Sequence, residues 1–294
     1  FEHNQEMREQ YLPQPTDRAW SAGTRDNTGD AIREGIRLGA RMHRLNEAWW
    51  CNTISVPGEE IPRLSIMEKS YPGSIVVNPA GERFSNESQN YMAFQQETFE
   101  KHSEDNPCYP TWQVFDANFR ATYFVGPLYT SKMRPDFLVP MKRYEKEGFM
   151  ATADNIRDLA AKISVNPDGL ENTVNRINQY AATGVDEDLQ RGESAYDRYY
   201  GDPRVSPNPC LGPVEKPPFY AVRVDPGDFG TQGGMVINAD AQVMHENGQV
   251  IEGLYATGNC AAPTLPCYPG PGSTLGPSMT FAYQAAKSIT GFQD

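Results

Sequence analysis

Near its C-terminal end, the chain places a tyrosine inside a run of prolines and glycines. The run reads YPGPGSTLGPS over residues 268–278 and leads into a helical pattern. A phenol, with an ordinary pKa near ~10, can donate a hydrogen bond to a carbonyl oxygen and stabilise an enolate. If the loop folds back, the backbone N–H of Gly272 reaches the same oxygen, so Tyr268 and Gly272 would form an oxyanion hole. A surface tyrosine packed on Pro269 is the alternative interpretation.

The residues on both sides of this tyrosine are typical of a cofactor site. The stretch GLYATGN is an apolar strand that ends in Gly-Asn, where the backbone can approach a ligand closely. Free N–H groups at the start of the next helix favour negative charge, such as that on the pyrimidine side of a reduced flavin ring. The segment therefore predicts cofactor binding by Gly258, Asn259, Ser273, Thr274, Leu275 and Gly276. A tight corner before a terminal helix explains the same composition without a ligand.

Composition restricts the partners and the compartment. The 294 residues carry a net charge of −12, which argues against nucleic acid as the main partner. Five cysteines without a C-x-x-C pair fit reduced thiols in a cytoplasm, and peripheral membrane association is compatible with that location. Four scattered histidines predict no metal site.

Periodicity predicts an α/β chain whose elements could position these residues. A helix over 27–47 is expected behind a Thr28/Asp30 cap, and a hairpin over 74–88. Two central helices each begin with an aspartate cap, and Gly184 closes the second. The irregular stretch 185–219 reads as a linker or a crossing loop. The remaining expected elements are helices over 154–163, 168–184 and 276–291, strands over 220–224, 233–238 and 253–258, and a polar loop over 99–112.

Several stretches resemble, in the same order, the bacterial 3-ketosteroid Δ1-dehydrogenases, which belong with the fumarate reductase flavoproteins. They include NTGDAIREGIRLGA, EAWW, PGSIVVNPAGERFSNES, GVDEDLQRGESAYDRYYGDP, PPFYAVRVDPGDFGTQGG and YATGNCAAPTLPCYPGPGSTLGPSMTF. The likeness extends over essentially the whole chain, and RGESAYDRYYGDP with YPGPG carries its specificity. The resemblance implies an FAD enzyme that introduces a 1,2 double bond into a 3-ketosteroid and passes electrons to a quinone-like acceptor.

The resemblance also implies roles for individual residues. Tyr268 and Gly272 match the pair that binds the 3-keto oxygen in this family and promotes enolisation. A second tyrosine takes the proton from carbon 2 while the hydride on carbon 1 passes to the flavin. Tyr91 is the best match for this base, although Gln89-Asn90 replaces the Ala-Pro of relatives; Tyr123 and Tyr129 are alternatives. A half-buried aromatic residue after a hairpin is the structural interpretation of Tyr91.

One half of the expected cofactor site has no counterpart in the sequence. The family opens with a strand–Gly-x-Gly-x-x-Gly–helix unit for the FAD pyrophosphate, and these 294 residues hold no such fingerprint. We therefore expect the C-terminal portion of the enzyme, with a complementary N-terminal flavin-binding chain as a possible partner. The implied architecture is a two-piece FAD-binding domain, 1–60 and 219–294, with an inserted α+β substrate domain at 61–218.

Two other functions are compatible with the sequence. A fumarate reductase-like enzyme would need arginine and histidine placed for two carboxylates, and the chain has few histidines. A non-catalytic truncated chain or partner chain, which binds steroid or a companion without turnover, would explain the missing fingerprint.

Overall fold

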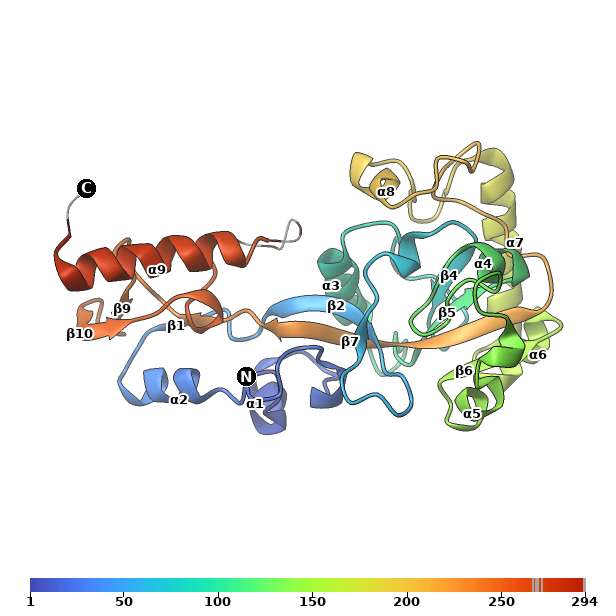
Figure 1. Cartoon of the computed structure of the whole chain (residues 1–294). Coiled ribbons are helices and arrows are strands. Elements are labelled where there is room, and N and C mark those ends of the chain that lie inside the picture. Colours follow the sequence, from blue (N-terminus) through green and yellow to red (C-terminus); the bar gives the residue numbers. More distant parts are fainter. Residues whose placement is uncertain (266, 268–269, 271, 293–294) are drawn as a thin grey trace. The chain divides into compact units, whose positions relative to one another are not determined.

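The structure, a computed structural model, describes residues 1–265, 267, 270 and 272–292, and it divides into two compact units. We call Phe1–Trp50 with Asp228–Asp294 the terminal unit, and Cys51–Gly227 the central unit. Helices and strands are mixed in both, in agreement with the predicted α/β class (Figure 1). None of the helices in the described part of the chain has the length and apolar character needed to cross a membrane.

A six-stranded sheet organises the central unit. Its strand order is β3-β2-β7-β5-β4, and β6 pairs with β7. Two of its strands are shared between the units: the first residues of β2, up to Trp50, and the last residues of β7, from Asp228, are part of the terminal unit. The strands are β2 (Ala48–Ile54), β3 (Arg63–Leu64), β4 (Ser74–Val77), β5 (Thr111–Phe115), β6 (Met150–Ala153) and β7 (Phe219–Thr231).

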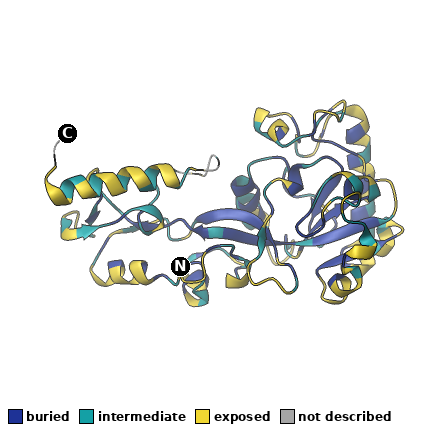
Figure 2. Cartoon of the chain, in the orientation of Figure 1, coloured by how far each residue is buried: buried dark blue, intermediate teal, exposed yellow. Residues whose placement is uncertain are grey.

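Both faces of this sheet are covered, because successive side chains of a strand point to opposite faces. Val114 of β5 and its pairing partner Ala221 of β7 lie in one apolar cluster with α6 (Ile156–Lys162) and α7 (Pro167–Thr183). The neighbouring Val222 lies in the other cluster, with α4 (Ala117–Thr122) and α5 (Met141–Lys146). Figure 2 shows most of this sheet as buried, whereas β3 is partly exposed. The other helices of the unit are η2 (Glu68–Ser70), α3 (Tyr91–Lys101), η3 (Asp136–Leu138) and α8 (Ala195–Tyr199).

The terminal unit has a smaller core, centred on Met235, Val243 and Ala261. Its strands form two antiparallel pairs, β1 with β8 and β9 with β10. The C-terminal helix α9 runs beside η4, and no described residue of α9 is buried (Figures 1 and 2). The elements are α1 (Gln5–Tyr11), η1 (Arg18–Trp20), α2 (Asp30–Arg37), β1 (Met42–His43), β8 (Gly234–Met235), β9 (Gln242–Met244), β10 (Val250–Tyr255), η4 (Gly258–Cys260) and α9 (Leu275–Thr290).

The predicted helices were correct in place and partly wrong at their ends. The helices α6, α7 and α9 are confirmed, and Gly184 ends α7 in the left-handed conformation. The predicted aspartate caps are wrong, because the side chains of Asn155 and Asn166 accept the first N–H groups of α6 and α7. The first helix is much shorter than predicted: Gly39, at a φ of +74°, turns the chain after α2, before β1 begins.

The predicted hairpin over 74–88 is half right. The first strand is β4, and the chain turns where Gly81 N–H donates to the carbonyl of Asn78 at 2.9 Å. No second strand follows, because the carboxylate of Glu87 accepts the backbone N–H of Val76 at 3.2 Å and so takes up an edge donor of β4. A side chain therefore replaces the expected strand partner.

The segment 185–219 is not an extended linker. It contains α8, and several of its polar residues are buried, including Asp186, Arg191 and Asp197. The segment is rich in glycine, proline and charge because its backbone turns repeatedly inside the central unit. Its buried charged side chains pair with other residues of that unit, as Asp186 does with Arg83. The polar loop predicted over 99–112 is shorter than expected. Because α3 continues to Lys101 and β5 begins at Thr111, only residues 102–110 lack helix and strand.

Candidate active site

A pocket of the terminal unit lies at the start of α9. Four of the six predicted cofactor residues line it: Gly258, Asn259, Ser273 and Thr274. The other two, Leu275 and Gly276, belong to the first turn of α9 and are not among its lining residues. The remaining lining residues are Trp49, Gln232, Ile237, Ala261, Ala262, Pro263, Thr264, Leu265, Pro277, Ser278 and Phe281.

The Gly-Asn pair is fixed by contacts from two other elements. The indole N–H of Trp49 donates to Asn259 Oδ1 at 2.9 Å, which orients the amide. The hydroxyl of Thr257 donates to the carbonyl of Ser278 at 2.8 Å, which joins the loop to α9. Gly258 has a φ of +63°, and a Cβ there would lie 3.3 Å from Ser278 Oγ. Glycine therefore allows both the backbone conformation and the close approach to α9.

Polar groups on the pocket wall are available for a ligand. The N-cap residue of α9, Thr274, makes no side-chain cap hydrogen bond to the described residues of the helix. Gln232 is 1% exposed, and its Oε1 has no hydrogen-bond partner in the described part of the chain. A buried amide oxygen without a partner is costly, so a donor on a bound molecule would satisfy it.

These groups fit a flavin. The isoalloxazine ring presents an N–H donor and carbonyl acceptors on its pyrimidine side, and the N-terminal end of α9 favours negative charge there. The rest of the pocket wall combines small polar residues, such as Ser273 and Ser278, with glycine, proline, alanine and larger apolar side chains, which suit a flat aromatic ring.

The predicted oxyanion hole is only partly described. Tyr268 lies outside the described residues, so its predicted role stays a prediction. Gly272 has a φ of +93° and its carbonyl accepts the N–H of Gly276 at 3.1 Å, which leads the chain into α9. Gly272 is not among the residues that line the pocket.

Tyr91 is the first residue of α3 and is 2% exposed. The side chain of Asn90 caps this helix by accepting the N–H groups of Met92 and Ala93, at 2.9 and 3.4 Å. The amide group of Asn90 also donates to the hydroxyl of Tyr196 at 3.1 Å. Asn90, directly before Tyr91, therefore forms hydrogen bonds through both its Oδ1 and its Nδ2 atoms.

The two alternative tyrosines have different surroundings. The hydroxyl of Tyr123 donates to Asp202 Oδ2 at 2.6 Å, and burial together with this carboxylate raises the pKa of Tyr123. A phenol that donates to a carboxylate is a poor base, because its anion would face a second negative charge. Tyr129 is 48% exposed. Tyr91 thus stays the stronger candidate for the base.

Two residues of the pocket were not predicted as site residues, Trp49 and Gln232. Both stand in stretches that carried the resemblance, EAWW and GTQGG. Neither pattern distinguishes a ligand-binding residue from a buried one, because the contact of Trp49 with Asn259 joins positions 210 residues apart in the chain.

Comparisons with known proteins agree with this geometry. A model of the FAD binding domain family matches residues 1–275. The chain is 41% identical over 98% of its length to the 3-oxosteroid 1-dehydrogenase of Mycobacterium tuberculosis (strain ATCC 25618 / H37Rv), and covers 51% of it. It is 40% identical over 90% of its length to the 4-oxocyclohexanecarboxylate 2-dehydrogenase of Sinomonas cyclohexanicum, and covers 46% of it.

A solved structure is similar throughout the chain. The crystal structure of 3-ketosteroid delta1-dehydrogenase from Sterolibacterium denitrificans, in complex with 1,4-androstadiene-3,17-dione, matches with a TM-score of 0.94 and 45% identity. The match covers 99% of this chain and 52% of that one. The chain therefore spans about half the length of the relatives it matches.

Proposed function

Because the chain belongs to the FAD binding domain family, with FAD as its cofactor, we propose that its protein removes hydrogen from carbons 1 and 2 of a 3-ketosteroid. One observation of the structure carries this proposal. Four residues that sequence reasoning assigned to the flavin line a single pocket, together with a buried amide oxygen that has no partner among the described residues. The steroid is favoured by the relative from Mycobacterium tuberculosis, which is named for a 3-oxosteroid, and by the structure from Sterolibacterium denitrificans, which holds 1,4-androstadiene-3,17-dione.

The chain's own residues would divide the chemistry between them. The hydroxyl of Tyr268 and the N–H of Gly272 bind the 3-keto oxygen and stabilise the negative charge that develops there. Tyr91 accepts the proton that leaves carbon 2. When bound, FAD would supply the acceptor for the hydride from carbon 1, so that the steroid loses one hydride and one proton, two electrons in all, and its 1,2 double bond forms.

The two compact units support separate domains for FAD binding and for substrate binding. We assign residues 1–60 and 219–294 to the FAD-binding domain and 61–218 to an inserted substrate domain. The breaks between the units, at Trp50/Cys51 and Gly227/Asp228, fall within about ten residues of these boundaries. The pocket lies wholly in the terminal unit, and the three candidate base tyrosines lie in the central unit.

The reduced flavin needs an acceptor, for which we propose a quinone-like molecule. A complementary N-terminal flavin-binding chain is the proposed partner, because the relatives are about twice as long as this chain. A cytoplasmic location, with peripheral attachment to a membrane, would give access to a quinone.

A smaller ring ketone is the second candidate substrate. The relative from Sinomonas cyclohexanicum is named for a 4-oxocyclohexane ring, in which a double bond also forms beside a ring carbonyl. The same pair of donors to the keto oxygen would serve either substrate, so the difference would depend on how much apolar surface is offered to the distal rings.

A visible spectrum of the purified protein, expressed as its gene encodes it, tests the proposal. We expect a flavin spectrum that bleaches when androst-4-ene-3,17-dione is added without oxygen. Bleaching by 4-oxocyclohexanecarboxylate alone would favour the second candidate. A protein with flavin that neither ketone bleaches would contradict the proposed reaction, and a colourless protein would contradict FAD as its bound cofactor.

A further inference from the structure

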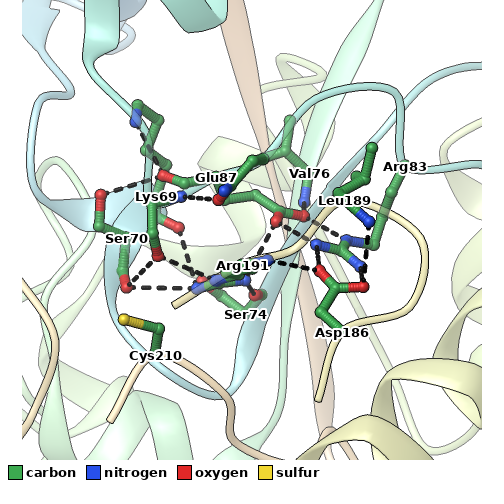
Figure 3. A network of polar contacts seen from close by, with 12 residues as sticks. Lys69, Ser70, Ser74, Val76, Arg83, Glu87, Asp186, Leu189, Arg191 and Cys210 are labelled. Carbon is green, nitrogen blue, oxygen red and sulfur yellow. Dashed lines mark hydrogen bonds and ion pairs between the residues drawn. The ribbon is translucent and has the colours of Figure 1, made fainter. Parts of the chain in front are cut away.

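The loop directly before Tyr91 is held by an unusual number of buried polar groups. Ser85, Glu87 and Ser88 are all 0% exposed, although they belong to a segment without helix or strand. Ser85 accepts a hydrogen bond from Gln89 within the loop, whereas Glu87 and Ser88 bind groups from two other parts of the chain, η2 and the segment around Arg191. Figure 3 shows Lys69, Ser70 and Arg191 around Glu87.

Lys69 binds this loop from η2. It is 1% exposed, and its Nζ donates to the backbone carbonyls of Glu87 and Gln89, both at 2.8 Å. Lys69 Nζ also lies 5.1 Å from the centre of the Phe94 ring, in the first turn of α3. Lys69 therefore contacts the chain just before Tyr91 and just after it.

Arg191 binds η2 and the loop together. Its Nε donates to Ser88 Oγ at 3.0 Å and its Nη1 to Glu87 Oε2 at 3.2 Å. Its Nη2 donates to three successive carbonyls, those of Lys69, Ser70 and Tyr71, at 3.4, 3.2 and 3.0 Å. This side chain is 1% exposed, and it fixes the lysine's backbone relative to the loop that the lysine binds.

A second arginine completes the charge balance. Arg83 binds both oxygens of Glu87 at 2.7 Å and both oxygens of Asp186 at 3.1 and 2.8 Å. Although burial raises the pKa of Glu87, the neighbouring Arg83 and Arg191 hold it below its ordinary value. The carboxylate thus stays charged and satisfied inside the central unit.

Burying these charged side chains carries a large desolvation penalty, so they contribute little net stability to the loop. A well-packed apolar cluster of similar volume is often as stable or more stable, so buried ion pairs are better explained by fixing one arrangement. Here the arrangement that they fix ends at the carbonyls of residues 87 and 89 and at the start of α3, where Tyr91 stands.

We propose that Lys69 and Arg191 are positioning residues, which hold the loop 85–90 so that the Tyr91 ring meets carbon 2 of the substrate in one orientation. This inference rests on the proposed function, with Tyr91 as the base. The network itself touches no reacting atom. Its effect would be on the distance and angle of proton transfer, to which rates are steeply sensitive.

The test uses the flavin-loaded protein and steroid carrying deuterium at carbon 2. Lys69→Met keeps the apolar stem and removes the Nζ group, and with it both hydrogen bonds to the loop. We expect flavin reduction in a single turnover to slow by about 10- to 100-fold, with a larger isotope effect, because proton abstraction becomes more limiting. Binding of the dienone product should change by less than about two-fold. Lys69→Arg, which keeps a donor, should restore most of the rate.

A second variant and a control distinguish loss of positioning from general destabilisation of the fold. Arg191→Lys keeps the charge, loses the fork of donors, and should show the same enlarged isotope effect. Arg8→Lys is the matched control, since Arg8 is 0% exposed and paired with Asp228 at 2.8 Å in the terminal unit. It should leave the isotope effect unchanged. Hydrogen exchange of the amides in 85–94 should quicken in the Lys69 and Arg191 variants only.

The outcomes separate the two proposals. An unchanged isotope effect and unchanged single-turnover rate in soluble Lys69→Met or Arg191→Lys would overturn the positioning role and leave the proposed function intact. Full activity of Tyr91→Phe would overturn the positioning role too, because there would be no base to position; loss of activity in Tyr123→Phe alone would then identify Tyr123. A wild-type protein that ketosteroids never reduce would overturn both.

Discussion

The two loops that lead to the proposed catalytic tyrosines are held in opposite ways. The loop before Tyr91 is buried and is held by two arginines that pair with two carboxylates, and by Lys69, which donates to two backbone carbonyls. Residues 253–286, which surround Tyr268, contain no Asp, Glu, Lys, Arg or His at all. Hydrogen bonds between uncharged groups hold them, such as the local one from Ser273 Oγ to the carbonyl of Gly270 at 2.6 Å and the long-range one from Trp49 to Asn259 at 2.9 Å.

The difference matches the two tasks that we propose. A base must meet one proton at one angle, and fixing a side chain in this way needs contacts from several parts of the chain. A cofactor cradle for a ring that becomes negatively charged needs N–H groups and the absence of carboxylates, which a neutral Gly/Pro turn before a helix provides. Four predictions test the contrast, in order of decreasing effect.

The largest effect should come from the charged loop. Glu87→Gln leaves Arg83 and Arg191 without their shared carboxylate, and breaking a buried ion pair of this kind costs about 3–5 kcal/mol. Ser273→Ala, the matched change in the neutral loop, removes one hydrogen bond and should cost about 1 kcal/mol. Urea unfolding of both variants measures the difference. Equal losses would remove the contrast between the loops.

Tyr268→Phe should act on turnover and hardly on stability. Loss of one donor to the developing oxyanion lowers kcat by about 10²–10³-fold. Steady-state kinetics with androst-4-ene-3,17-dione measure it, and Tyr199→Phe, at a side chain that is 76% exposed, is the control. Unchanged turnover would rule out Tyr268 as the donor to the carbonyl.

Stability should depend on pH through the central unit. Burial raises the pKa of Glu68 from 4.5 to about 7. The folded protein therefore holds this proton where the unfolded chain has lost it, and the stability it contributes is present below pH 4.5 and lost as pH rises through 7. We expect a loss of about 3 kcal/mol across this window.

Unfolding curves between pH 4.5 and 7.5 check this expectation. Glu68→Gln should flatten the dependence, whereas Glu104→Gln, at an exposed position, should leave it unchanged. A slope that persists in Glu68→Gln would assign the titration to another group.

The smallest effect should come from the turn before α9. Gly272 has a φ of +93°, where an alanine costs about 1–2 kcal/mol. An added Cβ meets no described atom within 4 Å at Gly272 or at Gly270, and only Gly272 of the two has a positive φ. Gly272→Ala should therefore weaken FAD retention by about ten-fold, and Gly270→Ala should not. Similar loss in both variants would point to crowding rather than backbone conformation.

Sequence reasoning succeeded where local chemistry decides. The helices α6, α7 and α9 were expected from periodicity, and Gly184 from its position after α7. Four predicted cofactor residues line one pocket because they flank a short loop, so that their nearness in sequence becomes nearness in space. The predicted second strand of the hairpin after β4 does not form, since Glu87, eleven residues further along the chain, accepts the backbone N–H of Val76 at the edge of β4.

The sequence by itself determined the α/β class, the neutral Gly/Pro turn before the last helix and the family. These depend on residue types and on spacings of a few positions, which neighbouring residues fix through backbone conformation. Only the tertiary structure decided that Lys69 and Arg191 converge on the loop before Tyr91, more than 100 residues apart in the chain. Periodicity cannot predict such a contact, because a buried charge is stable only where its partners are brought to it.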